Sequence, residues 1–157
     1  MIESYDIYQV IRDAREGSCG RILPPSLQEI LARYERRQKV EVFLFLLPLP
    51  LRRLFPREKW WLDTVNLWYR YHEEQGLDFA RNFNFLVEKN KQYGSTQLYR
   101  MDTLGLWLRS FDKVERIRTI DGGVKTDLLK NESRKDSLLD LFNYSILAVL
   151  VMRRKIT

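Results

Sequence analysis

Carboxylate side chains recur at helical spacing toward the end of the sequence. Glu132, Asp136 and Asp140 lie four residues apart, and Asn143 follows three residues after the last of them. On an α-helix these positions share one face, so the side chains form a polar stripe about two turns long. Carboxylate oxygens suit Mg²⁺, which commonly takes one or two protein carboxylates and completes its shell with phosphates and water. The stripe therefore predicts a magnesium site with Glu132, Asp136 and Asp140 as ligands, and with the two aspartates as catalytic residues.

Basic residues earlier in the sequence complement this stripe. Arg109, Asp112 and Arg116 lie three and four residues apart, and Lys113 adjoins them. Guanidinium and ammonium groups are natural donors to phosphate oxygens, so we expect Arg109, Lys113 and Arg116 to contact a phosphate. Two structural interpretations stay open. The cations suit ion pairs with the stripe across two antiparallel helices, and the first carboxylates of the stripe suit the positively polarised start of their helix.

Other catalytic arrangements find little support, because the chain has one histidine and one cysteine. Cys19 forms neither a disulfide within the chain nor a multi-cysteine zinc site. Residues 122–126, Gly-Gly-Val-Lys-Thr, only superficially resemble a phosphate-binding loop. His72 stands in a Tyr-His-Glu-Glu segment, and we expect it on an exposed helix face and not as a general base.

Apolar residues at three- and four-residue spacing predict a helical chain. Near the N-terminus, Tyr5, Tyr8 and Ile11 recur at three-residue spacing and predict a short helix that ends at Gly17 and Gly20. Ser26 and Glu29 form the pattern of a capping box, which opens a second helix. Further helices are expected over residues 58–74, 78–91, 103–120 and 132–153.

The fold class that we predict is all-α, a single-domain bundle of about five helices with an N-terminal extension. Residues 1–57 are expected to form a helical or extended region and residues 58–157 the helical domain, within one compact unit. For residues 40–47, a buried strand and a buried helix both stay open. The apolar run 42–51 contains Pro48 and Pro50 and falls short of the roughly 20 residues of a membrane helix, so we expect no membrane partner.

The charge balance favours anionic partners. The chain has 27 Lys and Arg against 21 Asp and Glu, a formal net charge of +6. Such an excess attracts polyanions such as nucleotides and nucleic acids. Two cationic clusters stand in the first half of the sequence: Arg33, Arg36, Arg37 and Lys39, then Arg52, Arg53 and Arg57. The first cluster suits either the solvated C-terminal end of a helix or an anionic partner.

The order of these motifs resembles a known family. Residues 91–95 (Lys-Gln-Tyr-Gly-Ser), residues 105–109 (Gly-Leu-Trp-Leu-Arg), the basic group that follows and the acidic stripe are similar to the nucleotide modification associated helical domain of phages and bacteria. The resemblance covers roughly residues 85–152. That family is compared with the all-α nucleotide pyrophosphohydrolases of the MazG and dimeric dUTPase type, whose acidic residues on two helices hold Mg²⁺.

The resemblance implies a nucleotide ligand, Mg²⁺ as cofactor and a homo-oligomer. It also implies that Tyr93 and Asn143 contact the nucleotide together with the basic residues. The chain departs from the pyrophosphohydrolases because it contains Glu73-Glu74 and Glu88 but no Glu-Glu-x-x-Glu run. Half of the two-helix magnesium cage is therefore missing from the pattern. The N-terminus lacks a secretory signal, so a cytoplasmic location is expected, in the host cytoplasm if the chain is phage-encoded.

The sequence thus predicts a protein that binds a nucleotide or nucleotide phosphate, and it leaves open whether a nucleoside triphosphate is hydrolysed with Mg²⁺. The alternative is a non-enzymatic assembly or interaction protein. In that case the aromatic and basic N-terminal half would dock a protein or nucleic acid.

Nucleic-acid binding by the basic clusters is expected to be weak and indifferent to sequence. The sequence shows no recognition helix, zinc finger or RNA-binding platform beside them, so binding would depend on released counterions. Titration of two unrelated duplexes and one single strand at low and physiological salt measures this. We expect similar affinities that fall steeply as salt is added. Tight binding that survives salt and discriminates between the duplexes would contradict this prediction.

Overall fold

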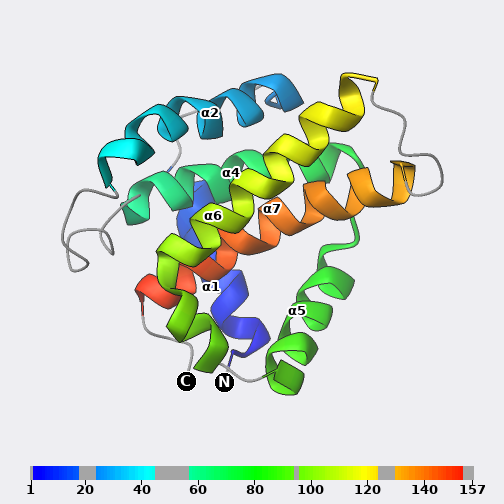
Figure 1. Ribbon diagram of the computed structural model, residues 1–157. Helices are drawn as coiled ribbons and strands as arrows, with labels where there is room; N and C mark the ends of the chain where they lie inside the picture. The colour runs from blue at the N-terminus through cyan, green and yellow to red at the C-terminus, as the bar shows by residue number, and fades with distance from the viewer. Residues whose placement is uncertain (1, 18–23, 45–56, 94–95, 124–129, 154–157) are drawn as a thin grey trace.

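Six α-helices make up most of the computed structural model (Figure 1). The structure describes residues 2–17, 24–44, 57–93, 96–123 and 130–153, with side chains for all of these except 38–44, 93, 96–102 and 130–133. No strand occurs in these ranges, so the all-α prediction is confirmed for them. The helices are α1 (Ser4–Glu16), α2 (Leu27–Leu44), α4 (Glu58–Glu74), α5 (Phe79–Tyr93), α6 (Thr96–Asp121) and α7 (Lys130–Met152).

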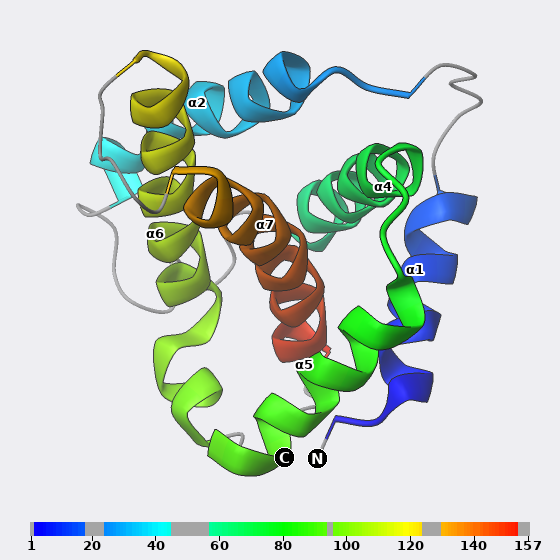
Figure 2. The same cartoon turned by 90° about the vertical axis from the view of Figure 1, so that its right-hand side faces the viewer.

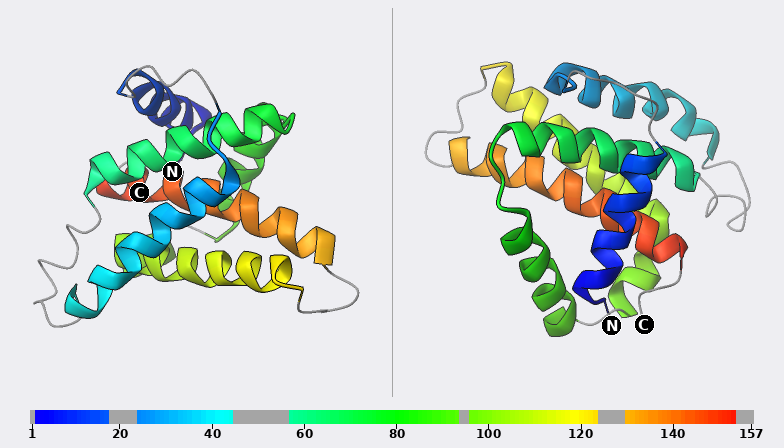
Figure 3. Two further views of the ribbon diagram at one scale, coloured as in Figure 1. Left: turned by 90° about the horizontal axis from the view of Figure 1, so that it is seen from above. Right: turned by 180° about the vertical axis from the view of Figure 1, so that it is seen from behind.

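Helix α7 lies at the centre of the molecule, although it comes last in the chain. Helices α1, α4 and α6 surround and contact it (Figure 2). Helix α2 lies across α4 and α6, and α5 extends beside α1 (Figure 3). The placement of α7 follows from its sequence, because a helix that is apolar on every side must be buried on every side. All residues from Ser145 to Val151 are buried.

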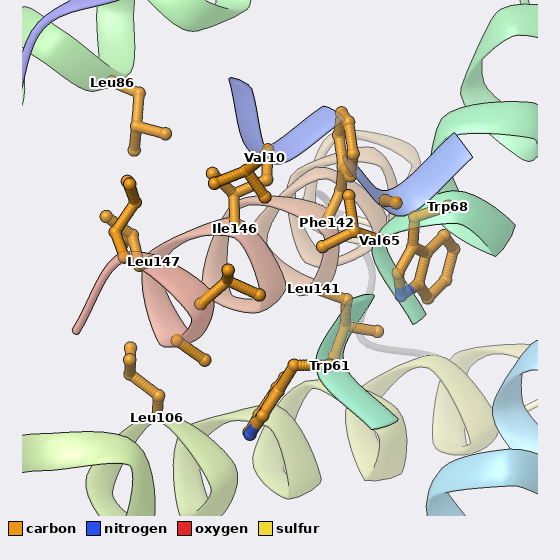
Figure 4. Close-up of a cluster of buried hydrophobic side chains, with 14 of the residues drawn as sticks. Val10, Trp61, Val65, Trp68, Leu86, Leu106, Leu141, Phe142, Ile146 and Leu147 are labelled. Carbon is orange, nitrogen blue, oxygen red and sulfur yellow. The ribbon is translucent and has the colours of Figure 1, made fainter. Parts of the chain in front are cut away.

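The core combines aliphatic side chains of α7 with aromatic rings of α4 and α6. Figure 4 shows Leu141, Phe142 and Ile146 of α7 facing Trp61 and Val65 and their neighbours. The indoles of Trp60, Trp61 and Trp107 meet edge to face, with ring centroids 5.0 to 6.0 Å apart. Edge-to-face contact adds to the stability gained by burying the rings.

A buried hydrogen bond joins α2 to this aromatic core. Trp68 Nε1 donates to the Tyr34 hydroxyl at 2.8 Å, and both residues are fully buried. Burial raises the pKa of Tyr34 well above its usual value, because water no longer stabilises the phenolate. Tyr34 therefore stays protonated and its oxygen stays available as the acceptor.

Arginine side chains form ion pairs between helices at the periphery of the molecule. Arg153, just after α7, donates to Asp13 of α1 and Glu58 of α4, each at 2.7 Å. Arg118 of α6 ion-pairs with Glu35 of α2 at 2.7 Å. These contacts join segments more than 80 residues apart in sequence, so they fix how the helices dock.

Most of the predicted helices are confirmed, with shifted ends. The amide of Glu29 donates to Ser26 Oγ at 3.2 Å, as the capping-box pattern predicts, and α2 follows. Helix α6 begins at Thr96, seven residues before the predicted start. Helix α2 continues through residue 44, and the rest of the apolar run 42–51 lies outside the described residues.

The first helix is confirmed, but the tyrosines whose spacing indicates it do not lie on its buried face. Tyr5 is 71% exposed and Tyr8 is 48% exposed, and the buried face consists of Ile7, Val10, Ile11 and Ala14. Spacings of three, one and three residues keep these four side chains on one stripe. The tyrosines lie beside that stripe, where their hydroxyls reach water.

The exposed position predicted for His72 is also wrong. Its side chain is 6% exposed and stacks with the rings of Trp68 and Phe142. His72 Nε2 lies 3.2 Å from the carbonyl oxygen of Leu138, so this nitrogen carries the proton and donates. Burial lowers the pKa of His72 to about 4, because the imidazolium would lose its hydration.

No helix within the described ranges is both long enough and apolar enough to cross a membrane.

We predict that His72 makes the fold sensitive to acid. Its pKa is lower in the folded chain than the unfolded value of about 6.5, so the unfolded state binds the proton first. This contribution to stability is present above pH 6.5 and lost as the pH falls through 4, by on the order of 3 kcal/mol. His72→Gln keeps a donor for the Leu138 carbonyl but does not titrate. Urea unfolding from pH 7 to 4 should show a smaller loss in the variant, and parallel losses would contradict the prediction.

Candidate functional site

A pocket of about 760 Å³ opens where α2 packs beside α4, next to the end of α1. Its wall combines cations, carboxylates and uncharged polar groups with the apolar side chains of Ala32 and Leu67. The lining residues are Gly17, Gln28, Glu29, Ala32, Arg33, Arg36, Lys59, Asp63, Asn66, Leu67 and Arg70. Four of them are basic and two are acidic, so the wall carries an excess of positive charge.

The two helices supply this wall from stripes at helical spacing. On α4, Lys59, Asp63, Asn66 and Arg70 follow one another at intervals of four, three and four residues, so they lie on one face. The opposite side of α4 carries the buried Trp61, Val65 and Trp68. Helix α4 is thus amphipathic, and its core packing turns the polar stripe toward the pocket.

Arg33 is the best-anchored cation of the pocket. Its Nε donates to Thr64 Oγ1 at 3.0 Å, and one terminal nitrogen donates to the carbonyl oxygen of Trp60 at 3.1 Å. The guanidinium lies 4.9 Å from the centre of a Trp60 ring and 3.7 Å from Asp63 Oδ2. These contacts hold α2 against α4 and fix a positive charge in the wall.

The surroundings of Arg33 shift its pKa in both directions, with a net lowering. Burial lowers its pKa, Asp63 raises it, and the neighbouring cations Arg37 and Arg36 lower it again. Arg36 and Lys59 are exposed at the same end of the pocket, because α2 and α4 run in roughly opposite directions (Figure 1). An anion at this end would reduce the repulsion among the cations.

Asn66 is the unusual polar group of the wall. Its side chain is 6% exposed, and its Oδ1 is buried with no hydrogen-bond partner among the described residues. Buried polar atoms are nearly always paired in folded proteins, so an unpaired amide oxygen in a pocket wall needs an explanation. A ligand that donates a hydrogen bond would supply one.

The residues predicted as a magnesium and phosphate site lie elsewhere, on α6 and α7. Lys113 Nζ lies 3.0 Å from Asp140 Oδ2, with both side chains partly exposed. Pairing between the two helices, one of the open interpretations, is therefore observed for these two residues. Asp136, Arg109 and Arg116 are exposed. The backbones of Glu132 and Tyr93 belong to α7 and α5, and their side chains lie outside the described part.

Asn143 lies in a different environment from the rest of the predicted stripe. It is 8% exposed and makes two hydrogen bonds with Asn82 of α5, of 2.9 and 3.2 Å. Each amide donates to the oxygen of the other, so the pair satisfies itself inside the protein. Asn143 thus joins α7 to α5, while Asp140 points toward α6.

The described residues contain no group of three or more His, Cys, Asp or Glu side chains that could hold a metal ion. Among the predicted ligands, Asp140 is paired with a lysine and Asp136 is exposed. These two carboxylates do not supply a converged magnesium site, and the Mg²⁺ ligand set stays a prediction.

The sequence reasoning did not find the pocket, although part of its signal was visible. Arg33 and Arg36 belong to the first cationic cluster, for which an anionic partner was one interpretation. The polar stripe of α4 has helical spacing. It combines cations, a carboxylate and an amide, and this composition is typical of a solvent-exposed helix face. Only the packing of α2 against α4 brings the two stripes together.

No protein-family model, curated protein or solved structure matches this chain. The resemblance to the nucleotide modification associated domain therefore stays a prediction from the residue pattern.

We predict that Asn143 stabilises the fold through Asn82. Replacing Asn143 by Ala leaves a buried amide unpaired, which should lower the free energy of unfolding by roughly 2 kcal/mol. The Asn82→Ala/Asn143→Ala double variant should lose less than the sum of the single variants, because neither amide is then left alone. Urea unfolding of the four proteins measures this coupling. Strictly additive losses would contradict it, and weaker ligand binding at unchanged stability would favour the nucleotide contact predicted from the sequence.

Proposed function

We propose that this protein binds a phosphate-bearing small molecule in the pocket between α2 and α4, with nucleotides as the class that the sequence resemblance implies. The observation that carries the proposal is the cationic end of the pocket, where Arg33, Arg36 and Lys59 gather. Guanidinium groups and ammonium groups are the side chains best suited to phosphate oxygens.

The local packing supports a binding role for this end. Arg33 is held in place by four contacts, so little of its conformational freedom remains to be lost on binding. Arg36 and Lys59 are exposed and able to close on an anion. The pocket is also of the size usual for small-molecule sites, which are roughly 300–1,000 Å³.

The proposal is limited to binding. Metal-assisted hydrolysis of a phosphoanhydride needs carboxylates that meet at one metal ion. The ion pair between Lys113 and Asp140 favours a structural use of the charged α6 and α7 faces. We therefore derive no catalytic step, and the non-enzymatic alternative fits this part of the molecule better.

Two double variants test the location of the site. Arg36→Ala/Lys59→Ala removes two cations from the pocket, and Arg109→Ala/Arg116→Ala removes two exposed cations from α6, so both variants have the same net charge. We expect the first variant to bind nucleoside mono-, di- and triphosphates at least tenfold more weakly, because each charged hydrogen bond contributes about 1.5–3 kcal/mol. The second variant should bind like the parent protein.

Isothermal titration calorimetry gives these affinities, and thermal shift with and without Mg²⁺ gives an independent reading. A ligand at 100 times its dissociation constant adds about 2.7 kcal/mol of stability. Unchanged affinity in the pocket variant would refute the proposed site. Loss in the α6 variant alone would place the phosphate on the residues predicted from the sequence, and no response to any nucleotide would refute the function.

A further inference from the structure

We infer that the pocket is built for a nucleoside monophosphate, with Asn66 as the residue that accepts a hydrogen bond from the base. This inference depends on the proposed function, because it assigns the part of the same pocket that does not hold the phosphate.

The two ends of the pocket differ in chemistry. Arg33 contacts Trp60 and Thr64 in the first half of α4. Arg36 follows one turn later on α2, toward the beginning of α4, because the two helices run in roughly opposite directions (Figure 1). Asn66 lies two helical turns after Lys59, about 10 Å along the axis. A phosphate at the cationic end therefore leaves Asn66 beside the far part of the ligand.

The side-chain oxygen of Asn66 accepts no hydrogen bond from the described residues. Four buried side-chain polar atoms lack a partner among the described residues, on Trp61, Asn66, Trp107 and Ser137. Asn66 is the one among these residues that lines the pocket. The terminal torsion of an asparagine side chain is broad, so the amide can turn toward a donor that enters.

The distance and the missing donor together define the ligand. A phosphate held by Arg36 and Lys59 lies about two helical turns from Asn66, so we expect a ligand longer than a simple sugar phosphate. In a nucleoside monophosphate the base is the part farthest from the phosphate, and every common base has an N–H or NH₂ group at its edge. The base donates to Asn66 Oδ1 while the phosphate contacts Arg36 and Lys59.

The pocket supplies the positive charge itself. Arg33, Arg36 and Lys59 neutralise a monophosphate dianion without a bridging metal ion. Binding in this pocket is therefore independent of Mg²⁺, unlike binding at a carboxylate site.

Asn66→Leu tests this assignment, with Asn84→Leu on the exposed surface of α5 as the matched control. Leucine has a similar size but accepts no hydrogen bond. We expect Asn66→Leu to bind AMP and CMP roughly five- to tenfold more weakly, with EDTA or Mg²⁺ making no difference. Ribose 5-phosphate, which has no base, should bind the parent and Asn66→Leu equally. The melting temperature of Asn66→Leu should match or exceed that of the parent, because an unpaired buried oxygen has been removed.

The outcomes separate this inference from the proposed function. If nucleotides bind and Asn66→Leu weakens AMP and ribose 5-phosphate equally or neither, the assignment of Asn66 is wrong and the phosphate site stands. If AMP binds no more tightly than ribose 5-phosphate to the parent protein, the pocket does not select a base. If no phosphorylated probe binds, the proposed function itself fails. Should Asn66→Leu not fold, Asn66→Ala replaces it in the same comparison.

Discussion

Burial of the second half of α7 on every side is the constraint on which the rest of the structure depends. An uninterrupted stretch of buried residues needs neighbours all around it, and α1, α4 and α6 provide them. Each surrounding helix must then present its own apolar stripe inward. For α4 this turns the aromatic residues toward the core and leaves a polar stripe on the outer side, against which α2 packs. The pocket is thus an indirect result of the way the core is filled.

Several polar groups buried in this arrangement have a side-chain or a backbone partner. Asn143 has Asn82, His72 has the Leu138 carbonyl, and Trp68 has Tyr34. Such partners fix the rotation of α7 relative to α4 and α5, and that of α4 relative to α2, because a polar atom moved away from its partner would stay buried and unpaired. Asn66 differs from these groups because its oxygen has no partner among the described residues and its side chain borders a pocket.

The sequence predicted the class of fold and most helices, because apolar periodicity and capping residues act locally. It failed where a side chain's environment depends on another helix. Tyr5 and Tyr8 have helical spacing but leave the core to Ile7 and Val10, and nothing in the Tyr-His-Glu-Glu segment reveals that His72 faces Phe142. Asp140 and Asn143 have the spacing of one helix face, but they contact different helices. Asp140 pairs with Lys113 of α6, and Asn143 bonds to Asn82 of α5. The pocket is lined by residues of both α2 and α4, so the sequence pattern of either helix alone could not predict it.

The central position of α7 also has a consequence for synthesis in the cell. Domains generally begin to fold while the ribosome is still adding residues, starting from the N-terminal side. Here the helix that the others surround is translated after all of them. Until then α1, α4 and α6 expose the apolar faces that later cover α7, and those faces are open to aggregation and to chaperones. The nascent chain is therefore expected to complete its core only after α7 has left the exit tunnel.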